Sequence, residues 1–414
     1  MPALFSRRVP DPAHRNPLAR AVSRRRRLGA PILDLTLANP TQVGLVSHPG
    51  VLAALTDPAG ATYAPDPCGD AGARVALARD LARRRPAKLK PRPQDLVLAA
   101  STSEAYSWLF KLLCDPGDEI LVPAPGYPLF AHLAALEGVI AVTYPLALQD
   151  RWRLDLEDVA VRVTSRTRAV VVVSPHNPTG WTLSNGEAAA LMKLAAARNL
   201  VVISDEVFAD FQFTGHRDWC SLPEQAAGKP APCLALAGRG GRRVSLGGLS
   251  KEAGLPQMKV GWLLLGGEAR WRREALARLE LIADTYLSLA TPQQKALPAW
   301  LRGARPYRRE LRRRLTENRR VLARALSRKN RGELLSSAGG WSAVIRLPMV
   351  RDDQEDALAL LREEGVLVHP GYYYDFTGGT FLVLSLLPRP GDFAEGVARL
   401  AAYLDRRPQG GGKF

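Results

Sequence analysis

The stretch AVVVVSPHNPTG at residues 169–180 decides the fold class, together with LVVISDEVF at residues 200–208. Each begins with an uninterrupted run of β-branched or aliphatic residues, which is typical of a strand covered on both faces. An alanine-rich segment lies between them and is predicted to be helical over Glu187–Ala197. This strand–helix–strand order predicts an α/β protein with a mainly parallel sheet, and polar side chains then collect at the strand ends.

The same alternation extends on both sides, from Leu96 to Gly267. Further strands are predicted at Leu96–Ala100, Glu119–Val122, Val139–Tyr144 and Val244–Leu246, and further helices at Ser103–Cys114 and Leu129–Leu136. After Gly267 the pattern changes to two long arginine-rich helices and then to a second, smaller α+β unit. We expect the helices at Glu268–Ala283, Pro292–Ser327, Gln354–Glu364 and Phe393–Asp405, and strands at Ser342–Leu347, Val366–His369 and Phe381–Leu386.

Four segments follow from this organisation. Residues 1–45 are expected to form an N-terminal arm that packs on the small domain, and residues 46–295 to form the large domain. Residues 296–405 are expected to form the small C-terminal α+β domain, and residues 406–414, with their glycine run, a flexible tail.

The composition excludes several classes of protein. The chain has 414 residues, of which 46% are hydrophobic and 23% charged, as expected for a soluble globular protein. Its net charge of +17 could indicate binding to nucleic acid or to an anionic membrane, but the arginines are scattered in short runs, which favours a solvated surface. We therefore expect neither nucleic acid nor membrane as a partner.

The cysteines and the N-terminal residues indicate in which cellular compartment the protein is expected. The four cysteines form no CxxC pair and are too sparse for a disulfide scaffold, so a reducing cytoplasm fits. The sequence has no apolar run long enough to span a membrane, and its first residues lack the apolar core and cleavage site typical of a signal peptide, so we expect neither. The first forty residues are arginine-rich like a transit peptide, but Pro10, Pro12 and Pro17 are expected to interrupt any long amphipathic helix there.

Two candidate catalytic residues follow predicted strands. Lys251 lies in the turn GGLSK at residues 247–251 and is one of ten lysines among 57 basic residues. An amine held in a tight turn can form an imine with an aldehyde cofactor, although an exposed loop lysine is the simpler reading. Asp205 ends the strand at 201–204, where it could keep a pyridine nitrogen protonated, or merely cap a helix.

Three further motifs also follow predicted strands. Asn177 is bracketed by two prolines, which could aim its amide at a ligand oxygen or simply form a turn. Ser101, Thr102 and Ser103 open a helix whose N-terminus could bind a phosphate, with helix capping by Ser103 as the alternative. Tyr127, in the segment PGYP, could stack on a flat ligand or pack within its loop.

The ordered set of these motifs resembles the class I and II aminotransferases, which are pyridoxal 5'-phosphate (PLP) enzymes of fold type I. The resemblance runs from the segment DLTLANPT at residues 34–41 to the last predicted strand. It implies a homodimer with shared active sites and PLP held as an internal aldimine on Lys251. It further implies that Asp205 pairs with the pyridine nitrogen, Asn177 contacts the ring hydroxyl and Tyr127 stacks on the ring.

The resemblance also implies a phosphate site and a substrate site. The phosphate-site residues are Ser101, Thr102, Ser103, Ser250, Lys259 and the partner subunit's Tyr63, which lies in the segment YAPDPCG. The substrate-site residues are Ala38, Asn39, Asn177 and Trp341.

Four positions depart from the family pattern. Phe208 stands where a tyrosine is common and cannot donate a hydrogen bond to the cofactor. Gly248 replaces a serine, and Lys259 replaces an arginine and so loses bidentate geometry. Val383 stands where the family usually has the arginine that binds the substrate α-carboxylate, so either the donor is an atypical amine or another arginine binds it. Arg346, Arg389 and the N-terminal arginines are candidates for that role.

The resulting prediction is a PLP-dependent aminotransferase that transfers an amino group between an amino donor and a 2-oxo acid. A β-eliminating lyase or a decarboxylase on the same scaffold is the alternative. A basic regulatory or nucleic-acid-binding protein is a more distant one, although too few residues precede Asp34 for a DNA-binding domain. The six histidines show no helical metal-site spacing, so no metal is expected, and His176 and His369 are interpreted as loop residues near the cofactor at most.

Overall fold

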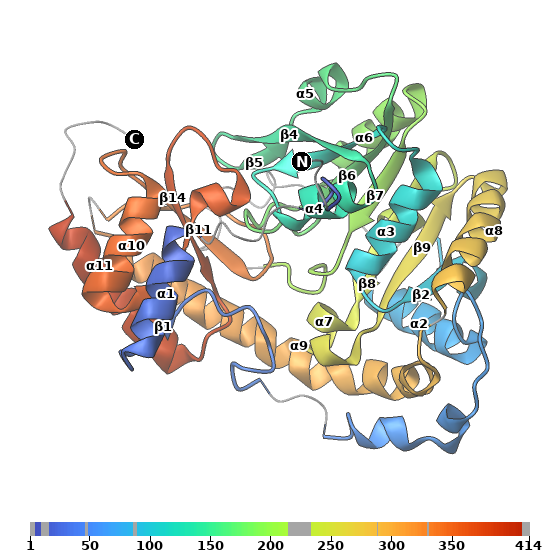
Figure 1. Ribbon diagram of the computed structural model, residues 1–414, viewed down its shortest axis with the longest axis horizontal. Helices are drawn as coiled ribbons and strands as arrows, with labels where there is room; N and C mark the ends of the chain where they lie inside the picture. Colours follow the sequence, from blue (N-terminus) through green and yellow to red (C-terminus); the bar gives the residue numbers. More distant parts are fainter. Residues whose placement is uncertain are drawn as a thin grey trace.

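A mixed, mostly parallel sheet of eight strands forms the centre of the larger part of the molecule (Figure 1). The computed structural model describes residues 5–9, 16–45, 49–85, 89–213, 233–287, 289–328 and 331–407. The strand order is β2-β9-β8-β7-β6-β3-β4-β5. These strands are β2 (Leu96–Ala99), β3 (Glu119–Ala124), β4 (Ile140–Leu148), β5 (Trp152–Leu154), β6 (Thr167–Val173), β7 (Val201–Asp205), β8 (Arg242–Gly248) and β9 (Gly261–Gly267). The α/β fold predicted from the sequence is confirmed.

Both faces of this sheet are covered, which explains the uninterrupted apolar runs. In β6, Val171 packs into a core with helices α3 and α8, whereas its neighbours Val170 and Val172 pack into a second core with α5 and α6. The helices of this part are α2 (Ala71–Arg84), α3 (Thr102–Leu113), α4 (Leu129–Leu136), α5 (Leu156–Val161), α6 (Asn185–Ala197), α7 (Leu249–Glu252) and α8 (Ala269–Tyr286).

A four-stranded antiparallel sheet, ordered β10-β11-β14-β13, organises the smaller part. Its strands are β10 (Glu333–Leu334), β11 (Ser342–Leu347), β13 (His369–Pro370) and β14 (Thr380–Ser385). Helices α10 (Asp353–Glu364) and α11 (Pro390–Arg406) share one hydrophobic core with β11 and β14. The predicted single strand Val366–His369 is wrong: β12 (Val366–Leu367) pairs with β1 (Leu33–Asp34), and only His369 and Pro370 join the four-stranded sheet.

The N-terminal segment reaches both parts of the molecule. Helix α1 (Pro17–Arg27) contacts α10, and its Leu18 is buried in the core of the smaller part. Pro17 does not interrupt this helix but starts it, because proline suits the first helical position, and Asn16 caps it. Residues 5–9 lie elsewhere: the Arg8 guanidinium donates to the carbonyl of Leu136 in α4.

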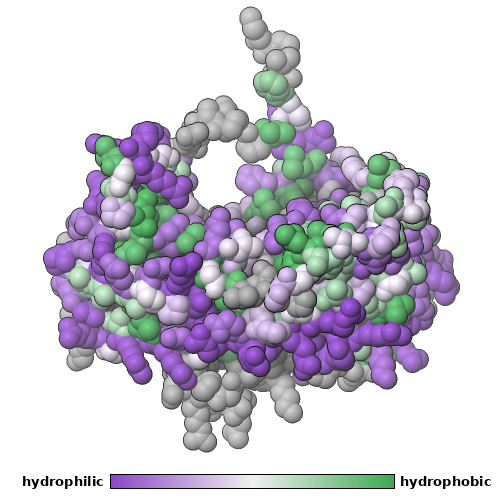
Figure 2. Space-filling view, turned by 90° about the horizontal axis from the view of Figure 1, so that it is seen from below, coloured by the Kyte–Doolittle hydropathy of each residue, from purple (hydrophilic) through white to green (hydrophobic). Residues whose placement is uncertain are grey.

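The long helix α9 (Thr291–Ala325) runs along both parts (Figure 1). Its first half, with Leu297 and Trp300, packs beside α2, while Leu311 and Leu322 pack in the core of the smaller part. None of the helices built from described residues is both long and apolar enough to cross a membrane. On the face seen from below, hydrophilic residues predominate and hydrophobic patches lie between them (Figure 2).

The C-terminal boundary needs a correction. Helix α11 includes Arg406, and Arg407 is buried in an ion pair of 2.7 Å with Asp356. The expected flexible tail therefore cannot begin at 406, and its remaining part, residues 408–414, lies outside the described residues. The division into domains otherwise stays a prediction.

Candidate active site

Two neighbouring parallel strands bring Asp205 and Lys251 to one edge of the sheet. Asp205 is the last residue of β7 and pairs in register with Leu246 of β8. Strand β8 continues to Gly248 and turns directly into α7, which carries Lys251. Since the carboxyl ends of parallel strands meet at the same edge, the two side chains are close enough for the charge of each to affect the pKa of the other.

The carboxyl group of Asp205 is buried and accepts two hydrogen bonds. The hydroxyl of Tyr106 donates to Oδ2 at 3.1 Å, and the backbone N–H of Val207 donates to Oδ1 at 3.2 Å. Burial raises the pKa of Asp205 to about 6, because desolvation disfavours the charged form more than these two bonds favour it. The carboxylate of Glu206 adds to this increase, and Lys251 opposes it.

The raised pKa of Asp205 predicts that its ionised carboxylate destabilises the folded state of the cofactor-free protein, by an amount that depends on pH. Below the ordinary pKa of 3.8 both the folded and unfolded chains hold the proton, and the cost is zero. As the pH rises from about 4 to about 6, the unfolded chain loses the proton first, so the folded state loses up to about 3 kcal/mol. We expect Asp205→Asn to unfold at higher urea concentration than wild type at pH 8, and at the same concentration at pH 4.

Urea unfolding of both proteins across this pH range is the measurement. Asp150→Asn, at an exposed turn, is the control and should show no pH-dependent difference from wild type. A constant offset between Asp205→Asn and wild type at all pH values would contradict the prediction.

Lys251 has an aromatic environment. Its Nζ lies 4.9 Å from the centroid of the Trp341 ring and 5.8 Å from that of Phe208. Burial lowers its pKa and the negative charge of Asp205 opposes this shift. A lysine with a lowered pKa is more often neutral and is therefore a better nucleophile.

Asn177 and Tyr127 approach the same region from other strand ends. Asn177 follows β6, and Ser342 of β11 donates to its Oδ1 at 3.2 Å, which links the two parts of the molecule. Tyr127 follows β3 and is 44% exposed, with its ring edge-to-face against Phe130. Burial raises the pKa of Tyr127, and the nearby charge of Asp205 adds to the increase.

The candidate phosphate site is the N-terminus of α3. Ser101, not Ser103, caps this helix: its hydroxyl accepts from the N–H of Glu104 at 3.1 Å. Gly261 packs against this turn so closely that a Cβ there would lie 2.9 Å from the carbonyl carbon of Ser101. Gly248 also lies beside Thr102. The start of α7, which carries Ser250, therefore adjoins the start of α3, and helix N–H groups there can bind an anion.

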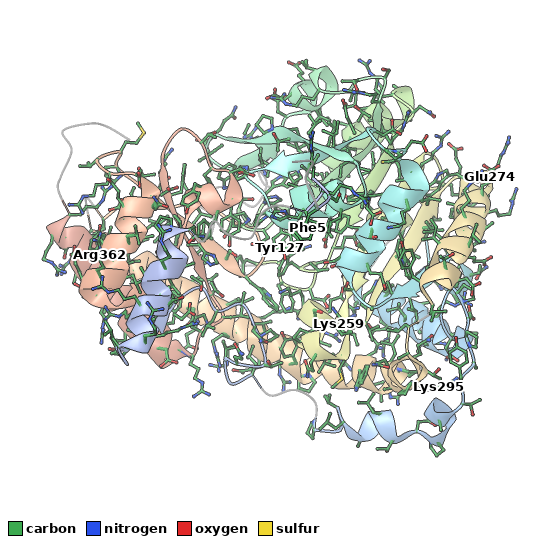
Figure 3. The ribbon with its side chains drawn as sticks, in the orientation of Figure 1. Phe5, Tyr127, Lys259, Glu274, Lys295 and Arg362 are labelled. Carbon is green, nitrogen blue, oxygen red and sulfur yellow. The ribbon has the colours of Figure 1, made fainter. Side chains whose placement is uncertain are left out.

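Lys259 and Tyr63 are exposed. Lys259 is exposed and has a left-handed backbone with φ of 52°. Figure 3 places it with Tyr127 in the central part of the molecule, away from peripheral residues such as Arg362 and Glu274. Tyr63 is 73% exposed.

The predicted substrate residues lie at the junction with the smaller part. Trp341 is buried and packs against Phe208, and the segment with Ala38 and Asn39 follows Leu37, whose carbonyl accepts from the Ser385 hydroxyl at 2.6 Å. Val383 is buried within β14, opposite Val344 on one side and His369 on the other. It forms part of an apolar core with residues of the large sheet.

Sequence reasoning missed three residues of this region: Tyr106, Ser342 and Glu206. Tyr106 lies on α3, but only the packing of α3 on the sheet brings its hydroxyl to Asp205, and Ser342 is likewise distant in sequence from Asn177. Glu206 follows Asp205 and was not singled out. His176 is fully buried; its Nδ1 lies 2.9 Å from the Thr179 hydroxyl, and burial lowers its pKa to about 3. Within the described ranges, no group of three His, Cys, Asp or Glu side chains is arranged to hold a metal ion.

The fold and the strand-end residues define a family, and comparison with known proteins identifies it. The profile of the family "Aminotransferase class I and II" matches residues 52–386, so the chain belongs to that family. The resemblance seen in the sequence is confirmed.

Individual relatives agree with this assignment. The chain is 25% identical over 406 residues to the glutamate-pyruvate aminotransferase AlaA of Escherichia coli K12, covering 94% of each chain. A probable N-succinyldiaminopimelate aminotransferase of Mycobacterium tuberculosis is 34% identical over 201 residues, which is 48% of this chain and 47% of that protein. The solved structure of an alanine aminotransferase from Pyrococcus furiosus superposes with a TM-score of 0.85 at 23% identity, covering 97% of this chain and 100% of that one.

Proposed function

We propose that this protein is a PLP-dependent aminotransferase with Lys251 as the residue that binds the cofactor covalently. One observation carries the proposal: a half-buried lysine with a lowered pKa and a buried carboxyl group lie at adjacent strand ends in a chain of the aminotransferase family. The fold alone would not be sufficient, because one fold serves several reactions.

The residues present fit PLP in three respects. The amine of Lys251 is suited to react with an aldehyde, the carboxyl of Asp205 is buried where it can pair with a ring nitrogen, and the start of α3 offers N–H groups to a phosphate. PLP would supply the aldehyde that accepts the amino group and the electron-withdrawing ring that stabilises negative charge at the substrate α-carbon.

The protein's own groups would have distinct tasks. Lys251 Nζ would remove the proton from the substrate α-carbon and deliver it to the carbon of PLP that carried the aldehyde. Asp205 would hold a proton at the ring nitrogen, with Tyr106 keeping its carboxylate in place. Asn177 and Tyr127 would orient the ring, and the phosphate would be bound by Ser101, Thr102, Ser103, Ser250, Lys259 and the partner subunit's Tyr63.

Borohydride reduction followed by peptide mapping tests this proposal. Reduction fixes a lysine-linked cofactor permanently, and we expect a phosphopyridoxyl group on the peptide that contains Lys251. A protein loaded with PLP that carries no such group, or carries it on another lysine, would refute the assignment.

The substrates are proposed to be an amino donor and a 2-oxo acid. Two observations bear on the donor: Val383 is buried in apolar surroundings, and Arg346, one candidate replacement for the missing arginine, is already paired with Glu333. We therefore propose that neither β14 nor Arg346 binds an α-carboxylate, so that the donor site accepts amines that lack one.

A panel of amino acids and simple amines tests this point. Each is scored by the loss of the visible absorbance of the lysine-linked cofactor in one half-reaction. Reaction with amines that lack an α-carboxylate is the expected result, whereas fast reaction with common amino acids only would show that another residue binds the carboxylate. Release of ammonia from a single amino acid, with no 2-oxo acid added as acceptor, would instead indicate elimination.

We further propose a cytoplasmic homodimer. The exposed aromatic ring of Tyr63 is available to a second subunit, and Cys68, Cys114 and Cys233 are free thiols, as in a reducing compartment. Sedimentation equilibrium at twice the mass of 45.1 kDa is the expected result, and a monomer would overturn the shared-site arrangement.

A further inference from the structure

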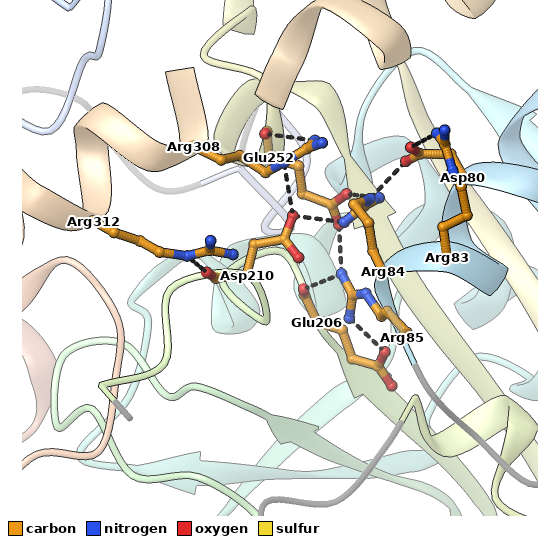
Figure 4. A network of polar contacts seen from close by, with 9 residues as sticks. All are labelled: Asp80, Arg83, Arg84, Arg85, Glu206, Asp210, Glu252, Arg308 and Arg312. Carbon is orange, nitrogen blue, oxygen red and sulfur yellow. Dashed lines mark hydrogen bonds and ion pairs between the residues drawn. The ribbon is translucent and has the colours of Figure 1, made fainter. Parts of the chain in front are cut away.

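Figure 4 shows a cluster of charged side chains, most of them buried. We call it the arginine cluster; it consists of Asp80, Arg84, Arg85, Glu206, Asp210, Glu252, Arg308 and Arg312. Its members come from α2 and its C-cap residue Arg85, the segment after β7, α7 and α9. Two of its carboxylates, Glu206 and Glu252, each follow a candidate catalytic residue, Asp205 and Lys251.

Arg85 contacts both of these carboxylates. Its Nη1 donates to Glu206 Oε2 at 3.0 Å, and its Nη2 donates to Glu252 Oε1 at 2.7 Å and to the backbone carbonyl of Glu206 at 3.3 Å. The planar fork of a guanidinium suits such a double contact, which a lysine ammonium could not reproduce. One side chain thus connects the residues that follow Asp205 and Lys251.

The remaining bonds leave both carboxylates little freedom. Glu206 Oε1 accepts from the Ser245 hydroxyl at 2.6 Å and from the N–H of Leu234 at 2.8 Å. Glu252 Oε2 accepts from Arg84 at 2.6 Å, so each of its oxygens is bonded to a different arginine. Glu206 and Glu252 are 6% and 1% exposed, so water cannot replace these bonds easily.

Arg84 extends the same connection to the rest of the fold. It also bonds Asp80 in its own helix and Asp210 after β7, both at 2.6 Å. The backbone carbonyl of Asp210 in turn accepts from Arg312 of α9 at 2.7 Å. Burial opposes the charge of Arg84, but the carboxylates of Glu252, Asp210 and Asp80 outweigh it and raise its pKa, so Arg84 stays charged.

Stability alone does not account for a cluster of this kind. Replacing buried ion pairs with apolar side chains is often neutral or stabilising, because the desolvation of the charges offsets much of their attraction. Arg85 contacts Glu206 and Glu252, which belong to the same backbone segments as the two candidate catalytic groups. Their geometric effect is to fix the distance between the end of β7 and α7.

We propose that Arg85 is a positioning residue, which holds Asp205 and Lys251 at a fixed separation through Glu206 and Glu252 and keeps the charge of these two carboxylates balanced. The inference rests on the proposed function, because it requires that Asp205 and Lys251 act on one cofactor. It adds to that function a residue that touches neither cofactor nor substrate.

Three variants of the PLP-loaded enzyme test the inference. Arg85→Gln removes the charge and the double contact, Arg85→Lys keeps the charge but not the fork, and Arg83→Gln is the matched control. Arg83 lies in the last turn of α2, two residues before Arg85, and bonds Asp80 at 2.8 Å, but its side chain is 61% exposed and no ion pair joins it to either glutamate. Circular dichroism and the unfolding temperature establish that each variant is folded.

Two readouts separate charge from geometry. The first is the pH midpoint of the visible absorbance of the lysine-linked cofactor, and the second is kcat compared with KM. In Arg85→Gln the unbalanced carboxylates favour protonated states, so we expect the midpoint to rise by about one pH unit. We expect kcat to fall about tenfold or more at a KM within about twofold of wild type, since misplacement affects the reacting groups more than binding.

The other variants decide between interpretations. Arg85→Lys should restore the midpoint but not kcat, and Arg83→Gln should match wild type in both. If Arg85→Gln does not fold, the charge-compensated double variant Arg85→Gln/Glu252→Gln takes its place, with kcat expected to stay low. A wild-type midpoint and kcat in the folded Arg85→Gln variant, or recovery of kcat in Arg85→Lys, would overturn the positioning role.

Borohydride mapping of the wild type separates the two proposals. Wild-type protein without a group on Lys251 refutes the proposed function and the role of Arg85 with it. Wild-type protein with that group, together with an Arg85→Gln variant of unchanged midpoint and kcat, refutes the role of Arg85 alone.

Discussion

Replacement of Lys251 by alanine is expected to lower kcat by a factor of about 10⁴ or more, because it removes both the covalent attachment point and the group that moves the proton. After borohydride reduction, mass spectrometry of this variant should find no phosphopyridoxyl peptide. Lys251→Arg should be equally inactive, since a guanidinium keeps the charge but cannot attack an aldehyde.

The control for this prediction is Lys193→Ala, which removes an exposed lysine of α6 and should leave both readouts unchanged. Transfer of the label to Lys259, with activity retained, would show that the attachment point has been misassigned.

Replacement of Asp205 by asparagine is expected to lower kcat/KM by about 10²–10³, the range found when one preorganised electrostatic group is removed from an active site. Asparagine preserves the shape of the side chain but cannot balance a positive charge on a ring nitrogen. Steady-state kinetics with saturating PLP measure this loss. The same substitution is expected to stabilise the cofactor-free protein at pH 8, so function and stability should change in opposite directions, as is common for buried active-site charges.

Tyr106→Phe provides a graded comparison. It removes only the hydroxyl that donates to Asp205 at 3.1 Å, so we expect a loss of less than about tenfold. An Asp205→Asn enzyme within about twofold of wild type would exclude Asp205 from the site, and a Tyr106→Phe loss as large as that of Asp205→Asn would assign the main role to Tyr106.

Much of the large sheet could be predicted from sequence because its strands are buried on both faces. The strands that end at Val173 and Asp205 contain uninterrupted apolar runs at residues 169–173 and 200–203, so both their type and their approximate ends are visible. The edge strand β5 (Trp152–Leu154) was missed, as it has only three residues and alternates in burial. The pair β12 and β13 was merged because nothing local shows that a chain leaves one sheet for another after two residues.

The candidate site shows the same limit. Residues at the ends of strands, such as Asp205 and Asn177, could be proposed one by one because the strand itself points to them. Tyr106, Ser342 and Arg85 could not, since each acts through a partner about a hundred or more residues away, and only tertiary packing supplies that contact. The helix cap was assigned to Ser103 instead of Ser101 because adjacent hydroxyl residues are equivalent by composition, and only the backbone conformation distinguishes them.

Two prolines lie inside α9, the helix that joins the two parts of the molecule. Pro298 and Pro306 cannot donate the usual helical hydrogen bonds, and Pro306 falls between Ala304, which packs with the large part, and Tyr307, which packs with the small part. Because one continuous helix joins the two parts, any closing movement of the small part over a substrate has to bend α9. The turn around Pro306 lacks a helical hydrogen-bond donor, so a bend of α9 costs least there, two residues from Arg308 of the arginine cluster.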